Sequence, residues 1–149
     1  MAVKPIPDGY HSVTPYLVVQ GVGKLIEFLT QAFDAQEVFR MPRPDGTIMH
    51  AEVRIGDSIV MMGEPMGELK PMPSAIYLYV NDMDAVYKRA LQAGATSMME
   101  PADQFYGDRH GGVKDPVGNI WWIATHKEDV PPEELAKRAE AFMQQQSRS

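Results

Sequence analysis

The second half of this sequence repeats the first half at a spacing of about 61 positions. Each copy has the hydrophobic pattern of a strand, a helix and then three more strands. One such copy is too short to close a sheet on itself, so two copies together are expected to enclose a cavity. The matched positions are Leu17, Val19, Leu25, Leu29, Gln31 and Ala32 in the first copy and Leu78, Val80, Val86, Ala90, Gln92 and Ala93 in the second. The repeat therefore predicts where a ligand binds without identifying it.

Apolar periodicity, prolines and glycines set the expected boundaries of the two copies. The first copy is expected to have strands at 12–20, 36–41, 47–55 and 58–63 and a helix at 21–34. The second is expected to have strands at 74–80, 96–100, 108–114 and 119–126 and a helix at 82–93, with Pro101 ending the strand at 96–100. The predicted fold is α+β, with two βαβββ modules at about 12–64 and 74–126 in a single domain spanning 12–130. Residues 1–11 are expected to be an extended arm and 131–149 a C-terminal helix and tail.

Charge and composition exclude several classes of function. The net charge of −6, with 14 scattered basic residues, argues against a nucleic-acid or membrane-surface partner. The absence of cysteine excludes disulfides, thiolate metal ligands and a cysteine nucleophile. The sequence contains neither a glycine-rich phosphate loop nor a Gly-x-Ser-x-Gly nucleophile motif. No apolar leader or membrane-spanning stretch is evident, so we expect a cytoplasmic protein.

Strand alternation assigns the tyrosines to one face of each sheet. Leu17 and Leu78 are expected to face the helices. Tyr16, Tyr77 and Tyr79 are then expected on the inner faces, which would line the cavity with aromatic rings and hydroxyl groups.

Two adjacent tryptophans follow the same rule. Trp121 is expected in the core, and Trp122 is expected on the inner face with the tyrosines. There Trp122 could form a stacking wall for a flat or aromatic ligand. Alternatively, these rings fill the cavity of a domain that binds no ligand.

Two histidines are candidate site residues. His50 and Glu52 lie two apart on one strand and share a face, as a general base and its orienting partner would. The other interpretation is that they form the polar face of an edge strand. His110 is the repeat counterpart of His50, either because both approach one pseudo-twofold axis or simply because the two halves share an ancestor.

Arg109 stands where a loop enters a strand. Its guanidinium could bind a ligand carboxylate or phosphate in bidentate fashion. It could equally hold the loop in place through Asp103, Asp108 or Asp115.

The paired pattern resembles the vicinal oxygen chelate superfamily, which includes glyoxalase I, extradiol dioxygenases and bleomycin-resistance proteins. Local motifs at residues 15–19, 49–58, 106–121 and 124–129 carry the resemblance, and they are similar to a bacterial glyoxalase-like branch. The resemblance covers roughly residues 12–130 and implies the fold, but not one activity, because this fold hosts many.

The resemblance also implies where a metal would bind. Metal-dependent members take one ligand from each of the first, fourth, fifth and eighth strands, and the matching positions here are Thr14, Val60, Ala75 and Trp122. None of these side chains is a usual ligand for a divalent metal. We therefore expect no metal or other cofactor at these positions.

Two functional hypotheses follow from the resemblance. The first is a metal-independent protein that binds a small molecule, similar to bleomycin-resistance proteins, in an aromatic-lined cavity. The alternative is a glyoxalase- or dioxygenase-like metalloenzyme with displaced ligands among His50, Glu52, Glu64, His110 and His126. A homodimer is expected as well, because such modules leave sheet edges and cavity mouths that a partner covers.

Overall fold

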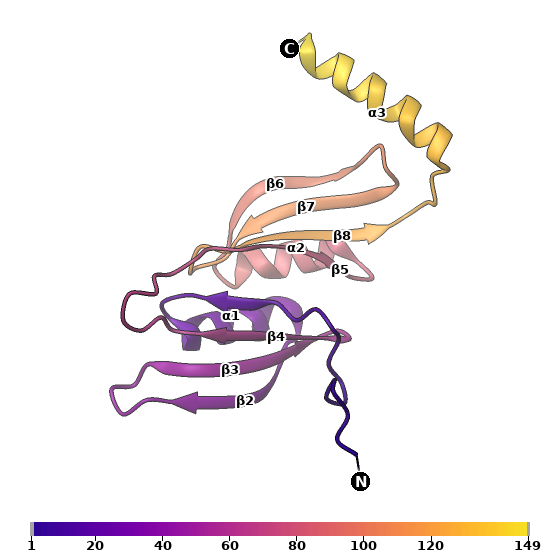
Figure 1. The fold of residues 1–149 in the computed structure, drawn as a ribbon. Helices are drawn as coiled ribbons and strands as arrows, with labels where there is room; N and C mark the ends of the chain where they lie inside the picture. The colour runs from indigo at the N-terminus through magenta and orange to yellow at the C-terminus, as the bar shows by residue number, and fades with distance from the viewer. Residues whose placement is uncertain (1, 149) are drawn as a thin grey trace.

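The computed structural model describes residues 2–148 and contains two βαβββ modules followed by a helix (Figure 1). The N-terminal module consists of β1 (Tyr16–Val18), α1 (Val22–Phe33), β2 (Gln36–Pro42), β3 (Ile48–Ile55) and β4 (Ser58–Gly63). The C-terminal module consists of β5 (Ala75–Tyr79), α2 (Met83–Gln92), β6 (Thr96–Asp103), β7 (Asp108–Lys114) and β8 (Ile120–His126), and α3 (Pro132–Ser147) follows. The expected α+β fold is confirmed. Met1 of the expected arm and Ser149 of the expected tail lie outside the described residues.

The two modules have the same sheet topology. The N-terminal sheet has the strand order β1-β4-β3-β2 and the C-terminal sheet has the order β5-β8-β7-β6. In each sheet the first pair is parallel and the others are antiparallel. Tyr16 pairs with Met61 in one sheet and Tyr77 pairs with Trp122 in the other, so these positions are structurally equivalent.

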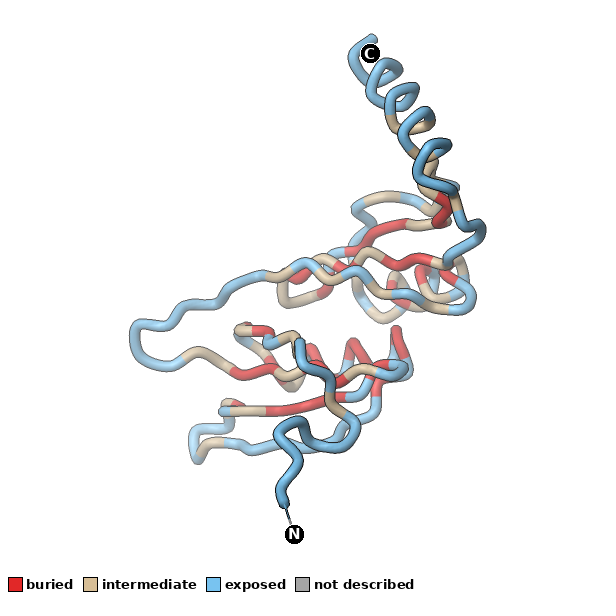
Figure 2. Tube along the Cα trace, turned by 45° about the vertical axis from the view of Figure 1, so that its right-hand side comes forward, coloured by how far each residue is buried: buried red, intermediate tan, exposed pale blue. Residues whose placement is uncertain are grey.

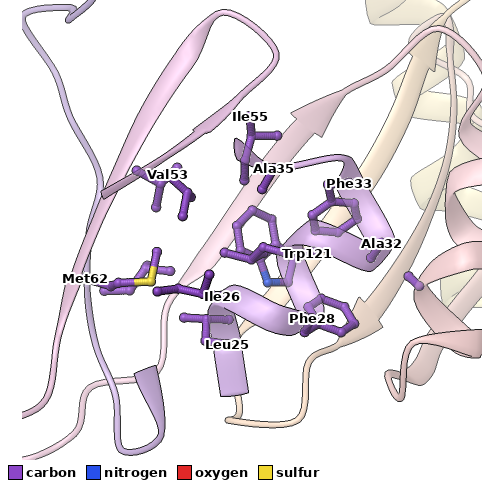
Figure 3. Packing of buried hydrophobic residues seen from close by; sticks show 14 of the residues in the cluster. Leu25, Ile26, Phe28, Ala32, Phe33, Ala35, Val53, Ile55, Met62 and Trp121 are labelled. Atoms are coloured by element: carbon purple, nitrogen blue, oxygen red, sulfur yellow. The ribbon is translucent and has the colours of Figure 1, made fainter. Parts of the chain in front are cut away.

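The modules meet through their helices. α1 contacts α2, and Phe33 of α1 packs on Trp121 of β8 with their ring centroids 5.1 Å apart (Figure 3). Leu17, Val53 and Trp121 are buried on the helix-facing sides of the sheets, as the alternation predicts. Among residues 2–148, no helix packs on the opposite faces of the two sheets, and we call them the open faces.

Two strand boundaries differ from expectation. β6 does not end before Pro101 but continues to Asp103. Proline is tolerated there because β6 is an edge strand and its pairing with β7 shifts register between Met99 and Ala102. β1 is shorter than the expected 12–20, although Pro15 still accepts a hydrogen bond from Met61 N at 2.9 Å.

The ends of the chain lie outside the core. α3 has no buried residue and projects from the C-terminal module (Figure 2). It is attached by Arg138, which donates to the Phe105 carbonyl, and by contact between the Phe105 and Phe142 rings. Within residues 2–148, none of the helices combines the length and apolar character needed to cross a bilayer.

Candidate functional site

Large aromatic side chains lie exposed on the open face of the C-terminal sheet. Tyr77 is 39% exposed and Tyr79 is 60% exposed, and both belong to β5, an edge strand of that sheet. Trp122 is opposite Tyr77 on β8 and is half-buried, whereas its neighbour Trp121 is fully buried. The expected division between a core tryptophan and a face tryptophan is confirmed.

Asp108 accepts hydrogen bonds from the tyrosine hydroxyl groups of this face. It is only 3% exposed, and its Oδ2 accepts hydrogen bonds from Tyr77 at 2.7 Å and Tyr79 at 2.8 Å. Its Oδ1 accepts from His126 Nδ1 at 2.7 Å. Burial alone would raise the pKa of Asp108, but the hydrogen bonds from His126 and the two tyrosines lower it below its usual value. Asp108 is therefore an ionised carboxylate at neutral pH, and it already accepts three hydrogen bonds.

Asp108 raises the pKa values of the three side chains that donate to it. The hydrogen bond to Asp108, followed by one from Nε2 to Asp129, raises the pKa of His126. Both ring nitrogens of His126 face carboxylate oxygens, which can only accept, so the ring is an imidazolium in this arrangement. Burial and the bond to Asp108 raise the pKa of Tyr77, and the bond to Asp108 raises that of Tyr79, so both remain phenols.

Next to Asp108, rings surround His110 on three sides. Its ring centroid lies 5.5 Å from that of Tyr77, 6.3 Å from Tyr106 and 5.4 Å from Trp122. Tyr106 Oη lies 2.9 Å from His110 Nδ1. Burial lowers the pKa of His110, so the ring is neutral at neutral pH. We call His110, Tyr77, Tyr106 and Trp122 the aromatic box.

Gly112 creates the space for the tryptophan of the box. A Cβ atom at Gly112 would lie 2.3 Å from Cζ3 and 2.4 Å from Cε3 of Trp122. The six-membered part of the indole therefore lies directly over the Gly112 backbone. The position of Trp122 therefore depends on the absence of a side chain at Gly112.

The open face of the N-terminal sheet carries a smaller polar cluster. His50 Nε2 lies 2.8 Å from Glu52 Oε2, and His50 Nδ1 lies 3.3 Å from Tyr16 Oη. Tyr10, from the N-terminal arm, donates to the other carboxylate oxygen of Glu52. Burial alone would raise the pKa of Glu52, but the bonds from Tyr10 and His50 lower it.

The shared face of His50 and Glu52 is confirmed, but the interpretation of an exposed edge strand is wrong. β3 lies between β2 and β4, so it is an inner strand. Glu52 is 9% exposed because Tyr10 lies against it.

Arg109 lies on the helix-bearing side of its sheet, away from the other candidates. It donates to Asp84 of α2 at 2.7 and 3.0 Å and to Asp103 at 3.3 Å. Of its expected partners, Asp103 is confirmed, Asp108 and Asp115 bond other groups, and Asp84 was not foreseen. A role of Arg109 in ligand binding stays a prediction.

Glu64, one of the displaced ligands considered, binds backbone instead. Its carboxylate accepts from Gly21 N at 2.8 Å and from Ile48 N, which joins the start of α1 to the start of β3. Among residues 2–148, no group of three or more His, Cys, Asp and Glu side chains is arranged to hold a metal ion.

One of the four implied metal positions is displaced by one residue. Val60 faces the core, where it pairs with Val53. Met61, opposite Tyr16, is the structural counterpart of Trp122. The hairpin turns have different lengths, because Ile55 pairs with Ser58 but Lys114 pairs with Ile120, so counting from the turn glycine gave the wrong register.

Three hollows border the candidate residues. One of about 570 Å³ lies beside Asp108 and Arg109. A groove of about 950 Å³ lies between the modules, and Tyr77 and Tyr79 line it together with Ile55 and Val60. A hollow of about 370 Å³ lies under the N-terminal arm beside Glu52.

Several residues of this site are not predicted by the sequence pattern. Asp108 was considered only as a partner of Arg109, although its spacing of two from His110 places both on one face. Gly112 continues the same alternation. Tyr10 and Tyr106 belong to an arm and a loop, where no periodicity indicates which way a side chain points.

Comparison with known proteins assigns the family. Residues 9–123 match the Glyoxalase/Bleomycin resistance protein/Dioxygenase superfamily, and the chain belongs to it. It is 38% identical over 135 residues to an uncharacterized protein of Mycobacterium bovis, a match that covers 83% of this chain and 89% of the relative. An uncharacterized protein of Mycobacterium tuberculosis is equally similar, with 79% of the relative covered.

Solved structures share the fold. TioX from Micromonospora sp. ML1 is 24% identical with a TM-score of 0.67, covering 78% of this chain and 98% of that one. A glyoxalase/bleomycin resistance protein/dioxygenase from Nocardioides is 18% identical with a TM-score of 0.61, covering 89% and 90%. At these identities the likeness concerns the fold alone.

Proposed function

We propose that this protein binds a small, flat organic molecule without the help of a metal ion. The observation that carries the proposal is the set of exposed rings on the open faces. Folded chains normally bury such side chains, and a contiguous exposed aromatic surface with a few polar groups is typical of a binding site. The four positions equivalent to the usual metal ligands, Thr14, Met61, Ala75 and Trp122, offer no carboxylate or imidazole.

We further propose that the site forms between two copies of the chain. Within residues 2–148 the helices α1 and α2 pack against each other, and no helix covers the open faces. A homodimer in which the N-terminal sheet of one copy faces the C-terminal sheet of its partner would cover both faces. It would bring Tyr16 and His50 opposite the aromatic box.

Binding in the presence of a chelator tests metal independence. Aromatic probes are expected to change the tryptophan fluorescence of the wild type equally with and without EDTA. Trp122→Phe should lose the fluorescence response and retain weakened binding by calorimetry, since a phenyl ring covers less of the ligand. The buried Trp121 remains in this variant as a fluorescent internal reference. Restoration of binding only by a transition metal would overturn the proposal in favour of a metalloenzyme with displaced ligands.

Mixing two inactive variants tests where the site forms. Tyr16→Ala alters only the N-terminal face and Trp122→Ala only the C-terminal face, so each homodimer should bind weakly. When the two variants are refolded together and pair at random, about half of the dimers contain one copy of each. Each mixed dimer has one site built from two unaltered faces and one built from two altered faces. About a quarter of all sites are therefore expected to bind normally. Calorimetry measures the number of binding sites per dimer, and light scattering checks the mass of the dimer. A mixture that binds no better than its components would contradict a shared site.

A further inference from the structure

The hydrogen-bonding groups of the aromatic box differ in their availability to a ligand. The hydroxyl protons of Tyr77 and Tyr79 are both donated to Asp108. Asp108 itself already accepts three hydrogen bonds, and Glu52 on the other sheet accepts two. Asp108 is 3% exposed and Glu52 is 9% exposed, so neither carboxylate is open to a cationic ligand.

Two nitrogen atoms of the box remain available. Within the described part of the chain, His110 Nε2 and Trp122 Nε1 have no hydrogen-bond partner, and neither is sealed from solvent. The indole nitrogen always carries a proton and can only donate. The character of the site then depends on which nitrogen of His110 carries the proton.

The contact with Tyr106 favours one tautomer of His110. A phenol is a stronger acid than a neutral imidazole N–H, so Tyr106 Oη donates to His110 Nδ1 across their 2.9 Å separation. Since the ring is neutral, its single proton is on Nε2. Both available nitrogens therefore donate.

From this arrangement we infer that the box selects planar aromatic molecules carrying a hydrogen-bond acceptor, such as a carbonyl oxygen or an unprotonated ring nitrogen, which receives the N–H of His110. The rings of Tyr77 and Trp122 supply the stacking surface, and Trp122 Nε1 offers a second donor. A molecule of the same shape without an acceptor would leave these donors without water or partner, which costs affinity. This inference rests on the proposed small-molecule site and names the class of its ligand.

The tautomer is measured first, without any ligand. Long-range ¹H–¹⁵N NMR spectra of the wild type near pH 7 are expected to show His110 as a neutral ring protonated at Nε2. Tyr106→Phe removes the donor to Nδ1 and should shift the ring toward a mixture of tautomers. A ring protonated at Nδ1, or an imidazolium at this pH, would overturn the inference.

The ligand class is measured with two probes of equal shape. Quinoline, which has a ring nitrogen acceptor, is expected to bind roughly tenfold more tightly than naphthalene, which has none. His110→Phe should abolish this preference, and His110→Gln, which restores an N–H donor, should recover part of it. Equal binding of the two probes to the wild type, or an unchanged preference in His110→Phe, would overturn the inference.

The two measurements separate this inference from the proposed function. If neither probe binds while NMR confirms the Nε2 tautomer, the proposed aromatic-ligand site is refuted, together with the ligand class based on it. If both probes bind equally, the site stands and only the selection by His110 is refuted. Circular dichroism of each variant identifies any loss of fold.

Discussion

Replacing Asp115 with alanine is expected to lower the free energy of unfolding by about 3–5 kcal/mol. The Asp115 carboxylate is 4% exposed and lies in the turn between β7 and β8. It accepts from Val117 N at 2.9 Å, from Asn119 N and Nδ2 at 3.0 Å each, and from Trp121 Nε1 at 2.8 Å. Alanine leaves these donors without a partner, and those of Asn119 and Trp121 are buried. Urea unfolding followed by circular dichroism measures the loss.

Asp57 provides the matched control for Asp115. It occupies the turn of the corresponding hairpin in the N-terminal module, but it is exposed and bonds only the neighbouring Ser58 hydroxyl among the described residues. Asp57→Ala is expected to change the unfolding free energy by less than about 0.5 kcal/mol. Similar losses in both variants would mean that the buried network of Asp115 does not stabilise the turn.

Adding one methyl group at Gly112 is expected to weaken ligand binding at least as strongly as a change in the box itself. Gly112→Ala places a carbon atom within van der Waals overlap of Trp122, so the indole must leave the wall. The expected result is a roughly tenfold loss of affinity for aromatic probes and a loss of about 1–3 kcal/mol in unfolding free energy, typical of overpacking. Calorimetric titration and urea unfolding measure the two effects.

The control for Gly112 is a glycine with space around it. A Cβ atom at Gly23 in α1 would come no closer than 3.8 Å to Ile48. Gly23→Ala is expected to stabilise the protein by about 0.5–1 kcal/mol, since alanine favours helix, and to leave binding unchanged. Native affinity in Gly112→Ala would show that the position of Trp122 is irrelevant to binding.

The fold could be predicted because it depends on periodic burial, which a sequence records directly. The helix expected at 21–34 is found at Val22–Phe33, and the side assigned to Trp121 is confirmed. Strand alternation also placed Tyr16, Tyr77 and Tyr79 on one kind of face, as found. These assignments need only local spacing.

The hydrogen-bond partners could not be predicted in the same way. Asp108, Tyr77 and His126 come from three strands, and their meeting depends on a strand order that alternation does not specify. Arg109 pairs with Asp84 because α2 packs on the side of the sheet to which Arg109 belongs. The register error at Val60 came from the different lengths of the two turns, which equal spacing of the repeat conceals.

Because Met61 and Trp122 occupy equivalent positions, the two open faces differ in rigidity. On the C-terminal face a rigid indole rests on the Gly112 backbone, and its neighbour Trp121 is tied to Asp115. On the N-terminal face the same position holds a thioether, and Met41 lies nearby, opposite His50. Methionine chains are flexible and polarizable, and they adapt to irregular shapes. If the two faces enclose a ligand, the rigid Trp122 face would fix the plane of the ligand, and the flexible methionine face would adapt to ligands of different thickness.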